Sequence, residues 1–399
     1  MLDPPAADKL IGDHLACLPI ESLPLGQCGG AVLRENIYAE RDQPPFDRVA
    51  MDGVALASST TAAGWRRFKL QGTQAAGDPP LTLASGEHCI EVMTGAVLPG
   101  GCDAVVPVEQ TRSAEGYVEL TLESPAVPWM HVARRASDRT QGALLLPSGS
   151  VLHAPEVAVA ASAGMARLRV SSQPAIMVVS TGNELVEPGE PIAPHQIRRS
   201  NAYAVAAALR QQGFHRVAED HLPDDAGLLR DRLRLHLTTH EALVLSGGVS
   251  MGRFDLVPKV LEELGVRCVF HGIAQRPGRP MWFGTSGEGS AVFALPGNPV
   301  STLVCLVRYV VPALFGAMGR PLVTPQRVAL AEPVDWQPAM TGFLPVRVAF
   351  DDWARTWATP CPTHNSGDFA ALARTDGFVE LPPGPAELAK GYVTRLFRW

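Results

Sequence analysis

Between residues 171 and 320, short unbroken apolar runs alternate with longer segments whose apolar positions recur at helical spacing. The runs at 175–180 and 242–246 have the composition of parallel strands that are buried on both faces. A helical pattern follows the first run, with Asn201 placed to cap its start and Gly213 placed to end it. This alternation predicts a doubly wound α/β domain over 171–320.

The rest of the chain has a different pattern. Residues 47–132 and 321–399 contain short strand-like runs separated by turn residues, so we predict a small β domain and a C-terminal β barrel or sandwich. Residues 1–46 are partly helical in pattern, and a helical pattern returns in 133–170. We predict that these two segments form one mixed N-terminal domain into which the β domain is inserted.

Composition narrows the function classes. The 399 residues, 46 % of them hydrophobic, are enough for several cores, and a formal net charge of −6 disfavours general nucleic-acid binding. Seven cysteines without a C-x-x-C pair predict neither a disulfide framework nor a zinc site. The N-terminus lacks signal-peptide features, and Arg308 and Pro312 interrupt the longest apolar stretch. We therefore expect a cytoplasmic protein without a membrane span.

Chemistry is expected where the parallel strands end, because ligands of doubly wound sheets bind outside the carboxyl ends of the strands. Acidic residues follow the first and second strands, and loops of small residues follow the third and the last. Such loops let backbone N–H groups approach an anion, and carboxylates beside a phosphate make an oxygen site for Mg²⁺. The residues concerned are Glu184, Asp224, Asp225, Gly247, Gly248, Ser250, Gly252, Asp255, Pro296, Gly297, Asn298 and Pro299.

Each of these features has a simpler interpretation when taken alone. Asp255 is suited to cap a helix, and the other acids are ordinary in solvated loops. Their placement on one edge of one sheet favours a phosphate and metal site. In the segment QRPGRP, Arg276 and Arg279 are held in a stiff turn, where they suit an oxyanion clamp, although a basic surface turn is the alternative.

Three motifs in this order carry a resemblance to a known family. The segments SGGVSMGRFD (246–255), RPGRP (276–280) and LPGNPVS (295–301) resemble the molybdopterin-binding domain shared by MoeA, gephyrin and certain adenylyltransferases. The rest of the chain is similar to molybdenum insertases of the MoeA type in the same order. The segments concerned are 45–55, 91–110, 134–149, 180–201 and 365–382.

The resemblance implies four domains, an elongated homodimer, and a cleft shared between the β domain of one protomer and the α/β and C-terminal domains of the other. It implies that molybdate is inserted into adenylated molybdopterin with Mg²⁺-dependent release of AMP. A molybdopterin adenylyltransferase and molybdoenzyme apoproteins would be partners, and Glu184, Asp224 and Asp255 would hold the metal. Matched by motif, the functional residues are Asp52, Thr94, Asp138, Glu184, Asp224, Asp255, Arg276, Arg279, Pro296, Pro299 and Ser366.

The sequence also departs from the family pattern. Arg48 and Val49 stand where Asn-Ser is usual, and Arg199 stands where Asp is common. A Lys is common near Gly272, and Lys is often found at the two positions of the RPGRP arginines. Because these changes alter charge or donor geometry, they bear on the degree of activity and on which pterin form and which oxyanion, molybdate or tungstate, is preferred.

Two other functions remain open from the residues. A non-catalytic paralogue would bind the molybdenum cofactor for storage or delivery without releasing AMP, and an adenylyltransferase would act one step earlier and consume ATP. The additional domains argue against the second. Asp52, Thr94 and Asp138 have ordinary interpretations as turn or loop residues when the family pattern is set aside. A membrane scaffold role like that of gephyrin has no supporting segment.

Overall fold

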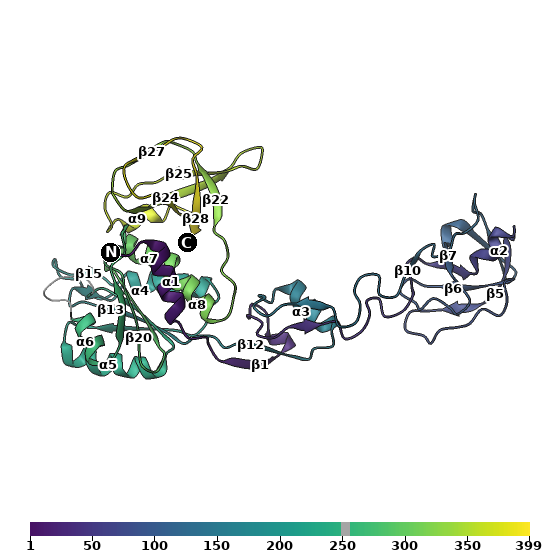
Figure 1. Cartoon of the computed structure of the whole chain (residues 1–399), viewed down its shortest axis with the longest axis horizontal. Coiled ribbons are helices and arrows are strands. Elements are labelled where there is room, and N and C mark those ends of the chain that lie inside the picture. The colour runs from purple at the N-terminus through teal and green to yellow at the C-terminus, as the bar shows by residue number, and fades with distance from the viewer. Residues whose placement is uncertain (249–255) are drawn as a thin grey trace.

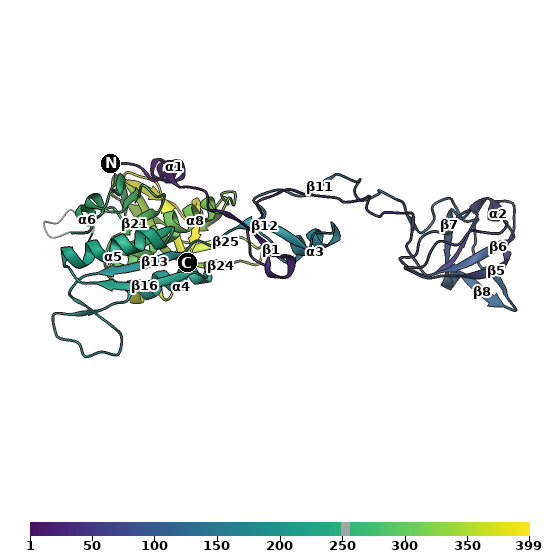
Figure 2. The same cartoon turned by 90° about the horizontal axis from the view of Figure 1, so that it is seen from below.

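The computed structural model describes residues 1–248 and 256–399. The chain is elongated, as Figures 1 and 2 show: the α/β domain and the C-terminal domain lie together at one end. A small middle domain follows, and the β domain lies at the far end, joined to the middle domain by two extended connections. The arrangement separates the two halves of the predicted functional machinery within one chain.

The described residues of the α/β domain form a six-stranded sheet covered by helices on both faces. The core on one face includes residues of α4 (Asn201–Gln211), and the core on the other includes residues of α5 (Ala226–Thr239) and α6 (Val257–Glu263). This double coverage explains the unbroken apolar runs of the central strands. The sheet order is β16 (Val217–Leu222), β13 (Ile176–Thr181), β17 (Ala242–Ser246), β21 (Ala291–Leu295), β20 (Trp282–Thr285) and β18 (Arg267–His271), of which the first four are parallel.

A long helical run follows the last parallel strand. It comprises α7 (Pro299–Cys305), the π-helical turn η3 (Leu306–Val310) and α8 (Val311–Ala317). By length and mean hydropathy alone, Pro299–Ala317 would pass for a membrane span, so the sequence argument against a span here was too strong. Its apolar window is 67 % buried inside the protein, which is the burial of a core helix.

The middle domain is built from two separate parts of the sequence. Strands β1 (Ile20–Pro24) and β12 (Arg167–Ser171) pair with each other, as do β2 (Ile37–Tyr38) and β11 (Leu144–Leu146). Helix α3 (Ala154–Ser162) and the 3-10 turn η1 (Leu25–Gln27) complete the domain around a shared core. The inserted arrangement is therefore seen, whereas the exact limits stay a prediction.

Helix α1 (Pro4–His14) packs on the α/β domain and not on the core of the middle domain. Its buried side chains Ala7 and Ile11 belong to the core of the α/β domain, where α1 lies beside α8. The sequence pattern showed a helix here, but it carried no information on which domain that helix would cover.

The β domain contains a six-stranded sheet with apolar clusters on both faces. The short helix α2 (Ser58–Ala62) and the 3-10 turn η2 (Val108–Gln110) complete it, and strands β3 (Arg48–Val49) and β10 (Val132–Ala133) pair at its base. The strand order is β7 (Ala104–Pro107), β4 (Gly53–Leu56), β6 (His88–Val92), β5 (Arg67–Gln74), β9 (Tyr117–Leu120) and β8 (Thr111–Ala114).

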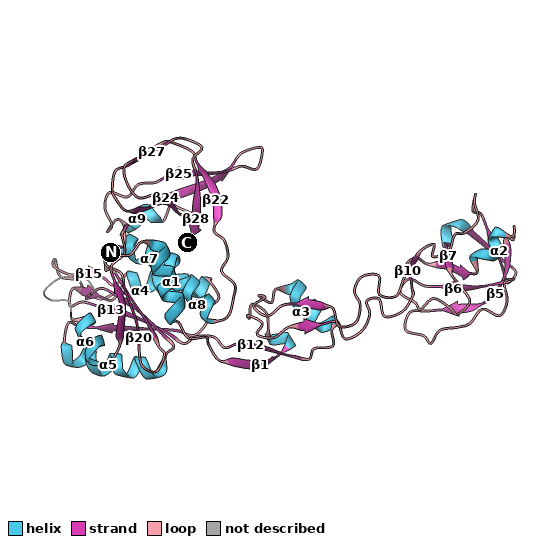
Figure 3. Cartoon of the chain, viewed as in Figure 1, coloured by secondary structure: helices cyan, strands magenta, loops and turns pink. Residues whose placement is uncertain are grey.

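The C-terminal domain is a closed barrel rather than a sandwich. Its ring of strands runs β24 (Thr341–Phe350), β25 (Thr356–Pro360), β22 (Gln326–Leu330), β28 (Val393–Arg398) and β26 (Gly377–Leu381), and pairing of β26 with β24 closes it. Figure 3 shows this barrel beside the helices of the α/β domain. Outside the ring lie the pair β23 (Val334–Trp336) and β27 (Ala386–Leu388), the short helix α9 (Phe369–Leu372), and β19 (Gln275–Arg276), which joins β24 from the α/β side.

Candidate functional site

The first two parallel strands end in turns that lock together. The backbone N–H of Asn183 donates to Oδ2 of Asp224 at 3.3 Å, and Oδ1 of Asn183 accepts from the backbone N–H of Asp224 at 3.0 Å. Glu184 lies in the same turn, and its carboxylate folds back over Gly182, where an added Cβ would lie 2.5 Å from Oε2. Two predicted acids, Glu184 and Asp224, are thus on neighbouring turns. The strand pair β14 (Leu185–Val186) and β15 (Ile197–Arg198) follows.

The acids differ in what they already contact. Asp225 caps helix α5, because its Oδ1 accepts from the backbone N–H of Leu228 at 2.8 Å. Glu184 and Asp224 are exposed and form no ion pair with any residue that the structure describes. Among these residues no group of three or more potential ligands is gathered. The predicted third acid, Asp255, lies outside the described residues, as do Ser250 and Gly252.

The glycines after the third strand allow backbone segments to meet closely. Gly247 and Gly248 both have positive φ, at 97° and 65°. A Cβ on Gly247 would lie 2.8 Å from the carbonyl oxygen of Thr181, and one on Gly248 would lie 2.9 Å from Oγ1 of Thr181. A Cβ on Gly297 would in turn lie 3.6 Å from Cα of Gly247. Three strand ends therefore meet at one point, as the sequence predicted.

Asn201 joins two of these strand ends. Its Nδ2 donates to Oγ of Ser246 at 2.9 Å and to the carbonyl oxygen of Gly297 at 2.7 Å. The prediction that Asn201 caps helix α4 was wrong: Ser200 occupies the cap position, and no side chain there bonds the helix. A helix does start at this point of the sequence, as predicted. The Asn201 amide, however, forms a tertiary contact and does not cap the helix.

The LPGNPVS segment forms the loop that opens α7. Pro296 is buried, Asn298 holds the N-cap position, and Pro299 begins the helix. Oγ1 of Thr302 donates to the carbonyl oxygen of Pro296 at 2.6 Å, which fixes the loop. On its other side, the backbone N–H of Val300 donates to the carbonyl oxygen of Ser366 at 3.1 Å. This loop therefore connects the strand edge with the C-terminal domain.

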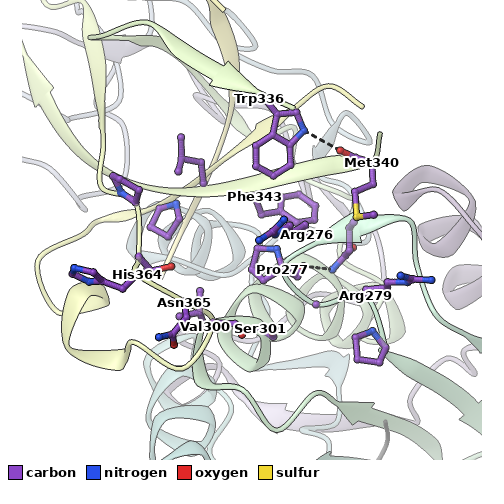
Figure 4. Close-up of a pocket in the computed structure, with 18 residues that line it drawn as sticks. Arg276, Pro277, Arg279, Val300, Ser301, Trp336, Met340, Phe343, His364 and Asn365 are labelled. Carbon is purple, nitrogen blue, oxygen red and sulfur yellow. Dashed lines mark hydrogen bonds between the residues drawn. The ribbon is translucent and has the colours of Figure 1, made fainter. Parts of the chain in front are cut away.

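A pocket of about 650 Å³ lies between the α/β domain and the C-terminal domain. We refer to it as the interdomain pocket, and Figure 4 shows its lining. It contains three predicted residues, the two arginines and Ser366, next to the start of α7. The lining residues are Gln275, Arg276, Pro277, Gly278, Arg279, Pro280, Val300, Ser301, Trp336, Met340, Phe343, Leu344, Pro345, Pro362, Thr363, His364, Asn365 and Ser366.

The two arginines supply cations to this pocket. Both are exposed, and neither makes an ion pair or a side-chain hydrogen bond within the part of the chain that the structure describes. In Figure 4, Arg276 lies in the middle of the pocket near Phe343 and Trp336, whereas Arg279 lies toward the margin and His364 points away. An unpaired guanidinium beside an aromatic wall suits an oxyanion attached to, or near, a flat ring.

Sequence reasoning missed the wall opposite the arginines. Trp336, Met340 and Phe343 come from the C-terminal domain, and the indole Nε1 of Trp336 donates to the carbonyl oxygen of Met340 at 3.0 Å. No periodicity in the sequence indicates that this domain folds against the arginine turn. The pairing of β19 with β24 brings the two together.

In the β domain, Asp52 and Thr94 meet although 42 positions separate them. Oδ1 of Asp52 accepts from the backbone N–H of Thr94 at 2.6 Å and from its hydroxyl at 2.7 Å. These hydrogen bonds hold the pKa of Asp52 below its usual value of 3.8, and the bond from the Thr94 backbone contributes most to this lowering. Asp138 is exposed nearer the middle domain, and its Oδ1 accepts from the hydroxyl of Ser137 at 3.2 Å.

The positions that depart from the family pattern have defined surroundings. Arg48 lies on β3 opposite Ala133, with its side chain exposed, while Val49 beside it is fully buried. Arg199 is buried and pairs with Glu187 at 2.8 Å. Arg199 is thus engaged in a structural ion pair. Arg48, in contrast, adds an exposed cation to the β3–β10 strand pair, a few residues before Asp52.

Comparisons with known proteins cover the whole chain. Residues 5–164 match the model described as MoeA N-terminal region (domain I and II), 177–316 match the probable molybdopterin binding domain, and 327–394 match MoeA C-terminal region (domain IV). A protein named molybdopterin molybdenumtransferase from Synechocystis sp. is 39 % identical over 400 residues, which cover 100 % of both chains. The chain belongs to the MoeA family.

Further relatives agree with this assignment to the MoeA family. A protein named molybdopterin molybdenumtransferase 2 from Mycobacterium tuberculosis is 30 % identical and covers 96 % of this chain and 95 % of its own. The crystal structure of a molybdopterin biosynthesis MoeA protein from Pyrococcus horikosii superposes with a TM-score of 0.83 at 31 % identity, covering 100 % and 99 % of the two chains. The predicted MoeA-like multidomain fold is confirmed.

Proposed function

We propose that this chain is a molybdenum insertase, which places molybdate on adenylated molybdopterin with release of AMP. Curated relatives over the full length are named as transferases of this kind. The observation that carries the proposal is the interdomain pocket, in which two unpaired arginines, the start of α7 and the Ser366 loop converge. Molybdate and the adenylated pterin are the substrates in this account.

The oxyanion is assigned to the interdomain pocket. Arg276 in its centre and Arg279 at its margin offer several N–H donors to an anion of charge −2, and the hydroxyls of Ser301 and Ser366 add neutral donors. The wall of Trp336 and Phe343 reduces water access on the other side. The pocket therefore binds and orients molybdate while the pterin approaches from the strand edge.

The adenylated pterin is assigned to the strand edge beside the pocket. Gly247 and Gly248 after β17 and Gly297 after β21 let these two strand ends pack closely against each other and against Thr181 of β13, which forms the backbone edge that we assign to the phosphate. The LPGNPVS loop contacts both this edge and the pocket, so one substrate spanning it would reach both. Pro296, Asn298 and Pro299 set the shape of that loop at the start of α7.

Mg²⁺ is proposed at the interlocked turns. Glu184 and Asp224 fit a hard cation, because both carboxylates are exposed, on neighbouring turns, and without a cationic partner in the described residues. When bound, the metal would neutralise charge on the phosphoanhydride as AMP leaves. The chain's own contribution is to lock the two turns together and to hold the Asp224 carboxylate in place through the Asn183–Asp224 hydrogen bonds.

We further propose a homodimer with a shared cleft. Asp52 and Thr94 lie in the β domain at the far end of the chain from the interdomain pocket (Figures 1 and 2). If the Asp52–Thr94 pair and the interdomain pocket act on one substrate, the pair must come from one copy of the chain and the pocket from another. A two-fold symmetric dimer allows this. Asp138, between the β and middle domains, would belong to the same half of the cleft.

The cytoplasm is the proposed compartment. All seven cysteines are free thiols in the structure, as a reducing environment leaves them. A molybdopterin adenylyltransferase that supplies the substrate and molybdoenzyme apoproteins that receive the product would be the partners.

The experiment that tests the function is incubation of the purified chain with adenylated molybdopterin, with and without molybdate and Mg²⁺. We expect AMP release that depends on both additions, measured by chromatography. The second candidate is a paralogue that only binds the cofactor; the observation that keeps it open is Arg48, an exposed cation that departs from the family pattern on the strand before Asp52. Tight pterin binding without AMP release under any condition would establish that candidate in place of the insertase.

A further inference from the structure

The arginine turn, residues 276–279, rests on a fully buried polar side chain. Gln275 is 0 % exposed, and its Oε1 accepts from the hydroxyl of Tyr309. Its Nε2 donates to the carbonyl oxygen of Pro277 at 3.1 Å (Figure 4). Burying an amide costs considerable desolvation free energy unless its polar atoms form hydrogen bonds. Both polar atoms of this side chain do so, which indicates a specific structural role.

A second contact supports the turn from below. Sγ of Cys305 lies 3.6 Å from Nε2 of Gln275 and donates to the carbonyl oxygen of Gly278 at 3.6 Å. Burial raises the pKa of the Cys305 thiol to about 12, so the sulfur stays protonated. A Cβ on Gly278 would lie 2.6 Å from both Sγ of Cys305 and Nε2 of Gln275. The turn backbone therefore packs directly on this network.

Both donors, the Cys305 thiol and the Tyr309 hydroxyl, come from the helical run that contains the π-helical turn. Cys305 ends α7, and Tyr309 lies four positions later inside η3. Arg308 of the same turn is held by Asp8 of α1 through two hydrogen bonds of 2.7 and 2.8 Å. π-helical turns inside longer helices occur frequently at functional sites. The support under the arginines is thus itself fixed to a third element.

Other contacts already close the turn. The backbone N–H of Ile273 donates to the carbonyl oxygen of Arg279 at 2.9 Å, and β19 pairs with β24 on the pocket side. The backbone N–H of Met281 also donates to the carbonyl oxygen of Gly278 at 3.3 Å, whereas no backbone hydrogen bond among the described residues reaches the carbonyl of Pro277. The fold of the turn as a whole is therefore set by these backbone contacts. The buried network adds a constraint on the middle of the turn, directly after Arg276.

We propose that Gln275 and Tyr309 are positioning residues, which hold the arginine turn so that Arg276 faces the interdomain pocket in a geometry fit for a tetrahedral oxyanion. This inference rests on the proposed function. Gln275 borders the interdomain pocket, but its side chain is 0 % exposed and that of Tyr309 is 1 % exposed, so both act on a bound anion through the arginine turn and not by direct contact. Their effect is on the affinity for molybdate alone.

The test uses Gln275→Met, which keeps the length of the side chain and removes its hydrogen bonds, and Tyr309→Phe, which removes one hydroxyl. We expect the half-saturating molybdate concentration to rise about tenfold in each, with kcat and the affinity for adenylated pterin within about twofold of wild type. Ser290→Ala is the matched control, because it deletes a buried hydrogen bond to Leu237 at the opposite edge of the sheet. It should leave the molybdate dependence unchanged.

Arg276→Ala is measured beside these variants, by molybdate titration calorimetry without pterin as well as by turnover. Weaker molybdate binding in Arg276→Ala with unchanged binding in folded Gln275→Met and Tyr309→Phe would overturn the positioning role and leave the proposed function intact. Unchanged binding in Arg276→Ala would instead count against the assignment of the oxyanion to this pocket. If Gln275→Met fails to fold, Cys305→Ala replaces it, and an unchanged molybdate affinity in that variant and in Tyr309→Phe also overturns the proposal.

Discussion

Replacing Arg276 with Ala removes the cation in the centre of the interdomain pocket. The side chain is exposed and has no partner among the described residues, so its removal leaves no buried group unsatisfied. The expected loss is therefore that of one charge-assisted contact to the oxyanion, about 1.5–3 kcal/mol. This corresponds to a weakening of molybdate binding by a factor of about 10–150.

The position of the two arginines makes the prediction more specific. Because Arg276 is central and Arg279 marginal in Figure 4, the effect of Arg279→Ala should be smaller than that of Arg276→Ala. Arg276→Lys keeps the charge and loses the planar pair of donors, so its affinity should fall between those of the wild type and the Ala variant. Increasing ionic strength should weaken molybdate binding in all of them, since the site is open to solvent.

The assay is the rate of AMP release as a function of molybdate concentration at saturating adenylated pterin and Mg²⁺. Arg267→Ala provides the control, because Arg267 is an exposed arginine on β18, an edge strand of the α/β sheet. We expect the half-saturating molybdate concentration to rise in the pocket variants and to stay unchanged in the control. An unchanged molybdate dependence in Arg276→Ala and Arg279→Ala would return both residues to a basic surface turn.

Mixed dimers of Asp52→Asn and Arg276→Ala chains, assayed at a molybdate concentration at which each variant alone has little activity, should recover about a quarter of wild-type activity, because half are heterodimers with one intact cleft of two; no recovery would contradict the shared cleft. Asp224→Asn keeps an acceptor for the Asn183 N–H but should slow AMP release on the order of 10²-fold and raise the Mg²⁺ requirement, measured by Mg²⁺ titration. Asp8→Asn leaves Arg308, 6 % exposed, without its carboxylate and should destabilise the protein by about 3 kcal/mol in urea unfolding; an unshifted midpoint would show that the pair is dispensable.

The parts of the fold that the sequence predicts well are those governed by local pattern. Strands β13 and β17 were evident because both faces of the sheet are covered, which demands continuous apolar residues. Gly213 ends α4 in the left-handed conformation, as its position indicated. The role of Asn201 was missed, because a cap and a tertiary hydrogen bond use the same residue types. Closure of the C-terminal barrel depends on the pairing of β24 with β26, for which no local signal exists.

The candidate site divides in the same way. The arginine turn was visible from its Pro and Gly residues, and the strand-end loops from their place in the sheet. The aromatic wall of Trp336 and Phe343 was not, because it depends on how two domains pack. Gln275 offered a weak signal, a polar residue beside an otherwise buried segment, but its partners Tyr309 and Cys305 come from a helix with a π-helical turn that periodicity alone does not reveal.

The central claim is the transfer of molybdenum to the pterin, and its most direct measurement is the formation of active cofactor. Purified chain is incubated with adenylated molybdopterin, Mg²⁺ and molybdate, and the product is offered to a molybdenum-free molybdoenzyme apoprotein whose activity is then scored. The account predicts activation in proportion to the AMP released, and little of either at the same molybdate concentration with the Arg276→Ala, Arg279→Ala double variant. AMP release without activation of the apoprotein, or activation that does not depend on added molybdate, would contradict it.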